Sequence, residues 1–309
     1  MTARTSHLVV GESVVDVLVR PDGRVERHPG GSPANVALGL GRLGRDVTLL
    51  TRLGRDDDGD LLRAHLGSAG VRLDVTDAQG PTSTARAVLD EHGAATYELD
   101  IAWSLDLAAA ARRRPTHVHT GSLATVLQPG ADVVHALLSA VRGGATVSYD
   151  PNVRPGLMGP RADAVPAVER LVALSDVVKA SEDDLRWLYP DRHPVDVAFR
   201  WLASGPALVV VTLGAHGSVA VTPHGVIESA PRTVDVADTV GAGDSFMAAL
   251  LARLGDGGLL GASGRRDLRV APTARLAPVL SWAAQAAALT VSRRGADLPD
   301  AAELARACA

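Results

Sequence analysis

Short apolar segments alternate with longer stretches rich in alanine and leucine along most of the chain. The apolar segments occupy residues 47–51, 117–121, 146–149, 177–179 and 208–213. Segments of this length, separated by helical patterns, predict βαβ units and a mainly parallel sheet. We therefore expect an α/β fold in three layers, with helices on both faces of that central sheet. In such sheets ligands bind beyond the carboxyl ends of the strands, so the site would draw on the whole chain.

One region departs from this alternation. Across residues 95–103 apolar and polar side chains alternate, which is typical of a strand with one solvated face. Upstream segments would pair with it. We expect a single domain over residues 1–309, with strands of a small β-sheet lid inserted at about 14–28 and 84–103. The alternative is that these strands extend the main sheet.

Composition limits the classes of partner. A chain of 309 residues with 46% hydrophobic content can bury one large core. The formal net charge of −4 argues against a nucleic-acid partner, and the arginines at 112–114 are a short run typical of a solvated loop. The only cysteine is Cys308, so no disulfide is expected. Without a signal-peptide pattern or an apolar run of about 20 residues, we expect a cytoplasmic protein with no membrane partner.

Residues 238–246, Asp-Thr-Val-Gly-Ala-Gly-Asp-Ser-Phe, combine a small-residue turn, a carboxylate and the start of an apolar helical pattern. The turn at 241–243 would lie at a helix N-terminus, where unpaired N–H groups and the helix dipole favour an anion. Asp244 would then lie in the first helical turn. A carboxylate there could take a proton from a hydroxyl that attacks phosphorus. The alternative is an ordinary helix entry with an acidic first turn.

A second small-residue segment, Gly-Gly-Ser-Pro-Ala-Asn at residues 30–35, is followed by Leu43 and Gly44. Together the two segments resemble the two signatures of the PfkB, or ribokinase-like, family of carbohydrate kinases. The resemblance runs from Gly11 to about Gly295. It implies a ribokinase-like fold and the ATP-dependent transfer of the γ-phosphoryl group to a hydroxyl of a small sugar, with Mg²⁺ accompanying ATP.

The resemblance also implies roles for individual residues. Asp244 would be the general base, and the turn that stabilises charge on the transferred phosphate would be Gly241, Ala242 and Gly243. The sugar would be bound by Asp16, Gly30, Gly31, Asn35, Asp244 and Arg154. The nucleotide would be bound by Lys179, Ser181, Thr212, Gly214, Gly217, Gly241 and Gly243. Arg154 belongs to a segment at 150–154 that resembles the family's Asp-Pro-Asn-x-Arg element.

Two further carboxylates receive ion-binding roles from the resemblance. Residues 179–184 occupy the place of an Asn-x-x-Glu motif that helps to organise magnesium, with Ser181 replacing the Asn and Asp184 replacing the Glu. We expect Asp184 to contact magnesium through water. The turn at Asp238 and the segment at 292–296 resemble places where relatives bind a monovalent cation, which suggests K⁺.

The acceptor sugar is the least determined part of the prediction. Gly11-Glu12 and the segments at 150–155 and 179–181 look more like bacterial fructokinases, which favours fructose. The alternatives are a 2-keto-3-deoxygluconate kinase, with Arg86 or Arg154 facing the acidic substrate, and a ribokinase or nucleoside kinase. A hypothesis of another class is a catalytically silent sugar-binding regulatory protein. In relatives such lids often pair between subunits, so a homodimer through the lid is plausible.

Three other patterns are set aside. Residues 39–44 satisfy GxGxxG but follow a helical run, so we expect a helix end with Gly44 as its C-cap. Residues 55–60 lack the first acidic ligand of a calcium loop. His117 and His119 share one face of a strand, but no third ligand at suitable spacing indicates a zinc site.

Overall fold

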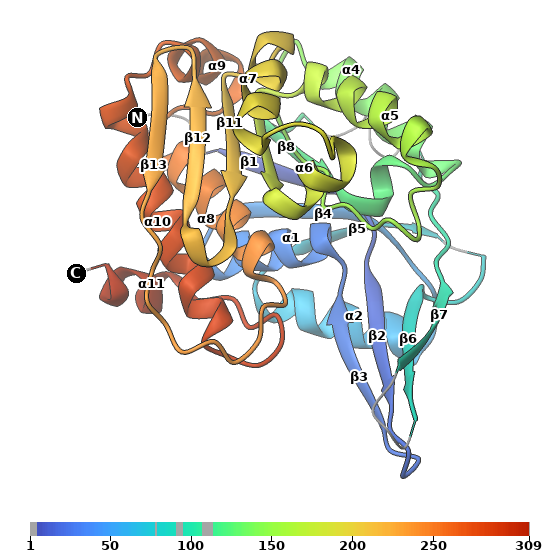
Figure 1. Ribbon diagram of the computed structural model, residues 1–309. Coiled ribbons are helices and arrows are strands. Elements are labelled where there is room, and N and C mark those ends of the chain that lie inside the picture. The colour runs from blue at the N-terminus through green and yellow to red at the C-terminus, as the bar shows by residue number, and fades with distance from the viewer. Residues whose placement is uncertain (1–4, 78, 91–94, 107–113, 309) are drawn as a thin grey trace.

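A computed structural model describes residues 5–77, 79–90, 95–106 and 114–308 (Figure 1). Within these ranges the centre is a nine-stranded sheet in the order β13-β12-β11-β10-β9-β8-β1-β4-β5. Its strands are β1 (Ser6–Val10), β4 (Asp46–Leu53), β5 (Arg72–Asp77), β8 (His117–Gly121), β9 (Thr146–Asp150), β10 (Val177–Ser181), β11 (Leu208–Thr212), β12 (Ser218–Thr222) and β13 (Gly225–Ser229). All neighbours from β5 to β11 run parallel, and β12 and β13 add an antiparallel edge. The mainly parallel sheet is confirmed.

Helices cover both faces of this sheet, as Figure 1 shows. Alternate residues of β1 point to opposite sides, so Val9 packs with one helical layer while Leu8 and Val10 pack with the other. The first layer includes α1 (Ser32–Arg42), α8 (Ala242–Asp256) and α10 (Thr273–Val291), and the second includes α4 (Gly130–Val141), α5 (Arg161–Leu174) and α7 (Pro194–Ser204). The other helices in the described part of the chain are α2 (Asp57–Ser68), α6 (Glu182–Leu188), α9 (Gly261–Arg269), α11 (Ala301–Ala307) and the 3₁₀ turns η1 (Ser122–Thr125) and η2 (Gly214–His216). The three-layer prediction is confirmed.

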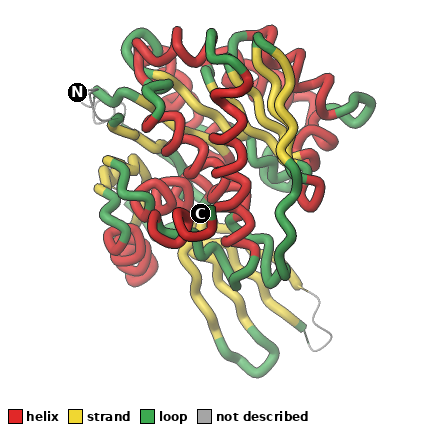
Figure 2. The backbone as a smooth tube through the Cα atoms, turned by 90° about the vertical axis from the view of Figure 1, so that its left-hand side faces the viewer, coloured by secondary structure: helices red, strands yellow, loops and turns green. Residues whose placement is uncertain are grey.

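A separate four-stranded sheet projects from the main body in both views (Figures 1 and 2). Its order is β3-β2-β6-β7, with β2 (Val14–Val19), β3 (Val25–Gly30), β6 (Thr84–Leu89) and β7 (Ala95–Asp100). Val15 and Val17 anchor it by packing against Leu53 and Leu62. The alternative that these strands extend the main sheet is therefore wrong. The last strand ends at Asp100 rather than at residue 103.

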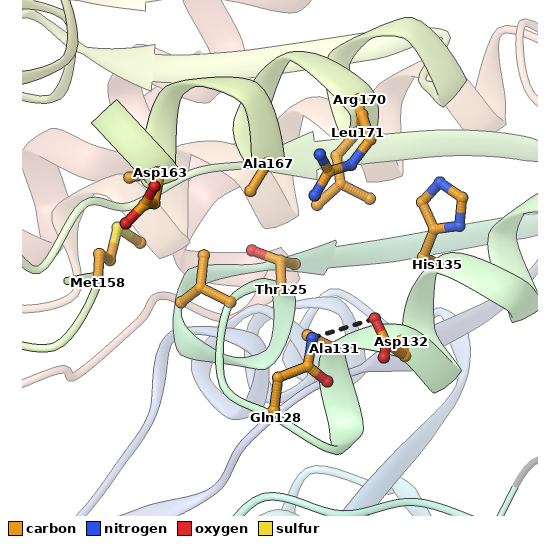
Figure 3. Close-up of a pocket in the computed structure, with 12 residues that line it drawn as sticks. Thr125, Gln128, Ala131, Asp132, His135, Met158, Asp163, Ala167, Arg170 and Leu171 are labelled. Atoms are coloured by element: carbon orange, nitrogen blue, oxygen red, sulfur yellow. Dashed lines mark hydrogen bonds between the residues drawn. The ribbon is translucent and has the colours of Figure 1, made fainter. Parts of the chain in front are cut away.

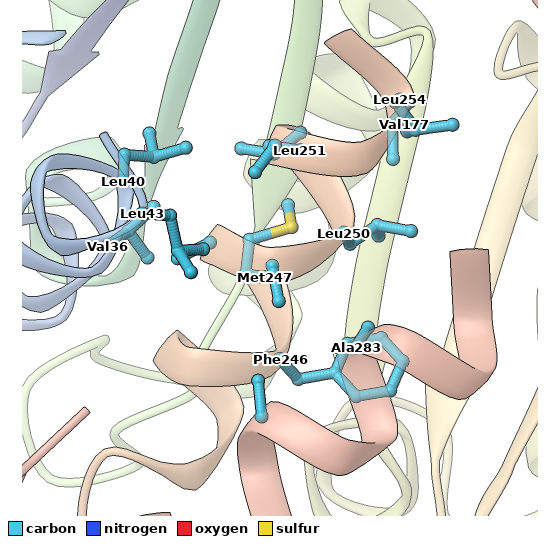
Figure 4. Packing of buried hydrophobic residues seen from close by; sticks show 14 of the residues in the cluster. Val36, Leu40, Leu43, Val177, Phe246, Met247, Leu250, Leu251, Leu254 and Ala283 are labelled. Carbon is cyan, nitrogen blue, oxygen red and sulfur yellow. The ribbon is translucent and has the colours of Figure 1, made fainter. Parts of the chain in front are cut away.

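Helices α1 and α8 approach closely around Gly39. A Cβ at Gly39 would lie 2.7 Å from the Cβ of Ala248 and 2.7 Å from a methyl group of Leu298. In Figure 4, side chains of α1 and α8 fill the space between the two helices. The helix end predicted at the GxGxxG pattern is present, but Leu43 is the C-cap and Gly44 follows it with φ 70°.

Gly39→Ala should destabilise the protein by about 1–3 kcal/mol, because the added methyl group overpacks the contact between α1 and α8. Gly67→Ala is the matched control. Gly67 also lies in a helix, but its Cβ would meet nothing within 4 Å, so helix propensity should stabilise that variant by up to about 1 kcal/mol. Urea denaturation measures both changes. Equal stability of the two variants would contradict a tight junction.

Three buried histidines lie together in the sheet. His7 of β1 pairs in register with His117 of β8, and their rings meet edge to face with centroids 5.3 Å apart. His119 is two residues further along β8 and is also buried. Burial lowers the pKa of His7 to about 4 and that of His119 to about 3. Neither ring nitrogen of His7 has a hydrogen-bond partner among the described residues.

His7→Leu should raise the free energy of unfolding, and by more at pH 5 than at pH 8. Burying an unpaired polar group costs about 1–3 kcal/mol, and leucine removes that cost. Because the folded pKa of about 4 lies below the ordinary 6.5, the unfolded chain binds more protons as the pH falls through this window. The buried His7 therefore lowers the free energy of unfolding of the wild-type protein as the pH falls from 6.5 to about 4. Urea denaturation at both pH values tests this, with the exposed His135→Leu as control; an equal gain at both would contradict it.

Candidate active site

The Asp244 carboxylate lies in the first turn of α8 and is held from α1. Its Oδ1 accepts a hydrogen bond from the Ser32 hydroxyl (2.6 Å), and its Oδ2 accepts one from the Asn35 amide (2.8 Å). Ser32 and Asn35 are three residues apart at the start of α1, so both side chains point the same way. The N-cap of α8 is Gly241, whose left-handed backbone (φ 77°) suits glycine. The N-termini of two helices thus meet at this carboxylate.

Opposing effects act on the proton affinity of Asp244. Burial raises its pKa, while the hydrogen bonds from Ser32 and Asn35 and the positive charges of Lys179 and Arg154 lower it. The carboxylate keeps lone pairs that neither donor uses. It can therefore accept a proton from a third group.

A buried ion pair borders the same turn. The ammonium of Lys179, a residue in the middle of β10, lies 2.8 Å from Oδ2 of Asp150 at the end of β9, and their side chains are 4% and 2% exposed. A Cβ on Gly243 would lie 3.2 Å from the ammonium nitrogen. Burial raises the pKa of Asp150 to about 6 although Lys179 lowers it. The structure thus places a fixed cation beside the N–H groups at the start of α8.

The residues predicted to bind sugar come together where the small sheet joins α1. A Cβ on Gly30 would lie 2.5 Å from Oδ2 of Asp16, which is on the neighbouring strand β2. Gly31 has φ 98°, and a Cβ there would lie 2.7 Å from the Glu12 carbonyl oxygen. Position 31 therefore requires glycine, whereas a larger residue at position 30 would displace the end of the Asp16 side chain.

Arg154 extends the site from the loop after β9. Its Nη1 donates to Oδ1 of Asn152 (2.9 Å) and to the carbonyl oxygen of Val153 (3.0 Å). Partial burial raises the pKa of Asp16, and the electrostatic influence of His28 and Arg154 opposes that rise. Arg154 thus acts electrostatically on both Asp16 and Asp244.

The residues predicted to bind the nucleotide lie at neighbouring strand ends. Ser181 ends β10 and pairs in register with Thr212 at the end of β11. Gly214 begins the 3₁₀ turn η2 with φ 54°, and the position of its Cβ is open. Gly217, just before β12, has φ 88°, and a Cβ there would lie 2.1 Å from the carbonyl oxygen of Ser229 at the end of β13. Only glycine allows the two backbone segments to lie this close.

Both predicted ion-binding carboxylates accept backbone hydrogen bonds. Asp184 closes a capping box with Ser181 at the start of α6 and also accepts from the Val153 amide (2.7 Å). Asp238 accepts from the amides of Val240 (3.0 Å) and Gly295 (2.9 Å), which joins the two segments that suggested a monovalent cation. Their ion-binding roles stay predictions. In the described ranges no group of three or more His, Cys, Asp or Glu side chains is arranged to hold a metal.

Some features of the site were missed from sequence. The Gly-Gly-Ser-Pro-Ala-Asn pattern assigns no role to Ser32, although its spacing to Asn35 indicates a shared helix face. The sequence pattern marks Asp150 as a strand end and does not indicate that it pairs with Lys179. Glu12 is buried and accepts from the Ala124 amide (2.9 Å), and burial raises its pKa to about 7. No local pattern distinguishes such buried carboxylates.

Arg86, the residue predicted to face an acidic substrate, lies on β6 and faces Glu98 of the neighbouring strand β7 at 3.6 Å. It pairs in register with Val17, the residue after Asp16. A cavity of about 380 Å³ lies between α4 and α5, with Arg170 and His135 among its lining residues (Figure 3). None of the predicted site residues lines it.

Among the helices that the structure describes, none has the length and apolar character needed to cross a bilayer.

Comparison with known proteins agrees with this geometry. The family model described as pfkB family carbohydrate kinase matches residues 4–309. A fructokinase from Klebsiella pneumoniae is 35% identical over 297 residues, covering 93% of this chain and 94% of that protein.

Solved structures give the same assignment. A fructokinase from Xylella fastidiosa with bound ATP has a TM-score of 0.87 and 27% identity, covering 99% of this chain and 98% of its own. A Vibrio cholerae fructokinase with bound fructose, ADP and potassium ion has a TM-score of 0.84 and 28% identity, covering 99% of both chains. The chain belongs to the pfkB family of carbohydrate kinases.

Proposed function

We propose that this sugar kinase phosphorylates fructose with ATP and that Asp244 is its general base. The observation that carries the role of Asp244 is its carboxylate, fixed by Ser32 and Asn35 in the first turn of α8 beside the Lys179 ammonium. The preference for fructose is supported by the relatives named fructokinase at 35% and 27% identity and by the bound fructose of a third.

The chemistry follows from the charges around this carboxylate. The acceptor oxygen forms a bond to the γ-phosphorus, the bond from that phosphorus to the β,γ-bridging oxygen breaks, and the acceptor proton passes to Asp244. The N–H groups of the 241–243 turn would face the negative charge that develops on the phosphoryl group. Magnesium, when bound with ATP, supplies further charge neutralisation.

The other predicted site residues would bind the sugar, the phosphate groups or Mg²⁺. Asp16 and Asn35 would bind sugar hydroxyls, and the glycines at 30 and 31 let the backbone approach the sugar. Arg154 would neutralise phosphate charge. Because no group of three or more His, Cys, Asp or Glu side chains in the described ranges is arranged to hold a metal, Mg²⁺ would be held mainly by phosphate and water oxygens, with Asp184 reaching it through water.

The potassium site, lid pairing and compartment complete the proposal. K⁺ would bind carbonyl oxygens near Asp238, where the segment at 292–296 meets the α8 turn. The four-stranded sheet would exclude water as a competing acceptor, and two copies would pair through it as a homodimer. We place the reaction in the cytoplasm, where ATP is available.

ATP consumption across fructose, ribose, 2-keto-3-deoxygluconate and adenosine tests the substrate. We expect fructose to be preferred, and Asp244→Asn to lower turnover by several orders of magnitude because its amide cannot accept the proton. Sugar binding measured by calorimetry should survive in that variant. Preference for the keto acid or a nucleoside would overturn fructose, sugar binding without any turnover by the wild type would favour the silent binding protein, and full activity of Asp244→Asn would overturn the mechanism.

Ser32→Ala should move the acidic limb of the pH profile of kcat/KM to higher pH by about one unit. The lost hydrogen bond favoured the ionised carboxylate, so the pKa of Asp244 rises and ionisation needs a higher pH. Lys179 and Arg154 still face Asp244 in this variant, which limits the shift. Ser32→Thr keeps a hydroxyl and is the control. An unchanged acidic limb in Ser32→Ala would show that the hydroxyl does not tune the base.

A further inference from the structure

Lys179 is the only lysine of the chain. Lysine and arginine together number 31, so every other side chain in that count is an arginine. Arginine side chains form the ion pairs of the surface, and Arg265 pairs with the buried Asp176 at 2.7 Å. Position 179 is the only one with a lysine ammonium group. Because ammonium is compact and guanidinium is planar and wider, the position selects for size and point charge rather than for charge alone.

The surroundings of this ammonium are confined. It lies between the Asp150 carboxylate, 2.8 Å away, and the first turn of α8, where a Cβ on Gly243 would be 3.2 Å away. Burial lowers the pKa of Lys179, but Asp150, Asp184 and Asp244 outweigh burial and raise it. The Lys179 side chain is therefore charged where it lies beside the first turn of α8. Glycine at 243 leaves the room that the ammonium occupies.

Stability alone does not explain this arrangement. Buried ion pairs lose hydration that their attraction only partly restores, and apolar replacements are often as stable. The ammonium also lies beside the positive end of the α8 dipole, where a cation is unfavourable. An anion that contacts both the ammonium and the α8 N–H groups would offset both costs. In the proposed reaction that anion is the phosphoryl group.

We propose that Lys179 contacts the phosphoryl group during its transfer and that Asp150 is the positioning residue that holds the ammonium at the α8 turn. This inference rests on the proposed function. Lys179 exchanges no proton: the acceptor proton goes to Asp244, and the electron pair of the broken bond stays on the bridging oxygen of ADP. Lys179 supplies charge where the phosphoryl oxygens gain it.

Kinetics of substituted proteins give the first test. Lys179→Met should lower kcat about a hundredfold or more while the KM for ATP changes little, because the lost contact forms in the transition state. Lys179→Arg should be similarly impaired despite its charge. Asp150→Asn should lower kcat about tenfold, since the ammonium stays but is held less firmly.

Asp176→Asn is the matched control for Asp150→Asn. Asp176 is also buried and paired with a cation, but it precedes β10 and its partner is Arg265 rather than Lys179. Its substitution should lower thermal stability while the kcat of the folded protein stays unchanged. An equal loss of kcat in both variants would reduce the role of Asp150 to structural support and overturn its assignment.

The single lysine allows a readout that does not depend on turnover. Protein labelled with ¹⁵Nζ-lysine contains one side-chain ammonium signal. Magnesium, ADP, fructose and fluoroaluminate, which mimics the phosphoryl group in transfer, should shift this signal more than magnesium, ADP and fructose alone. Asp150→Asn should move the signal before any ligand is added, whereas Asp176→Asn should not.

The outcomes separate this inference from the proposed function. Turnover that survives in Asp244→Asn would overturn the general-base mechanism itself. If Asp244→Asn is inactive but Lys179→Met keeps kcat within about threefold, or fluoroaluminate leaves the lysine signal unmoved, the role of Lys179 is wrong while the base assignment stands. A raised KM for ATP with unchanged kcat in Lys179→Met would make it a ground-state nucleotide ligand instead.

Discussion

The site depends on the junction between the N-termini of α1 and α8. Ser32 and Asn35 reach Asp244 only because the two helices pack at Gly39, where a Cβ would lie 2.7 Å from Ala248. The hydrogen bonds orient a buried carboxylate that would otherwise be costly to leave without partners. The same junction joins the small sheet, which ends at Gly30 before α1, to the glycine turn before α8. In the proposed function, the sugar and the phosphoryl group would meet at this junction.

Charge at the carboxyl ends of β9 and β10 is arranged around that junction. Asp150 and Lys179 form a buried pair, and Asp184 is satisfied by backbone amides of the adjoining loop and helix. The ammonium and the positive end of α8 both face Asp244, where an incoming phosphoryl group would meet them. A preorganised field of this kind needs little rearrangement during reaction, because the donors are already fixed by the fold.

Much of the architecture could be predicted from sequence, because apolar periodicity reports locally on strands and helices. The parallel strands, the strands of the separate small sheet and the start of α8 at the 241–243 turn followed from such patterns. The end of β7 was placed too late, since the alternation continues beyond the paired residues. Gly44 was expected as the C-cap of α1, but the cap is Leu43, because helix ends depend on how the last turn closes.

The sequence by itself determined the order of the elements, the glycines that the turns require and the presence of a carboxylate at the start of α8. Only the tertiary structure decided that the Ser32 hydroxyl belongs to Asp244, that Asp150 holds Lys179, and that Asp184 closes a capping box. The reason is physical: periodicity and turn chemistry act between near neighbours, whereas Ser32 and Asp244 are separated by 212 positions. Their distance depends on how the helices pack, which no local pattern encodes.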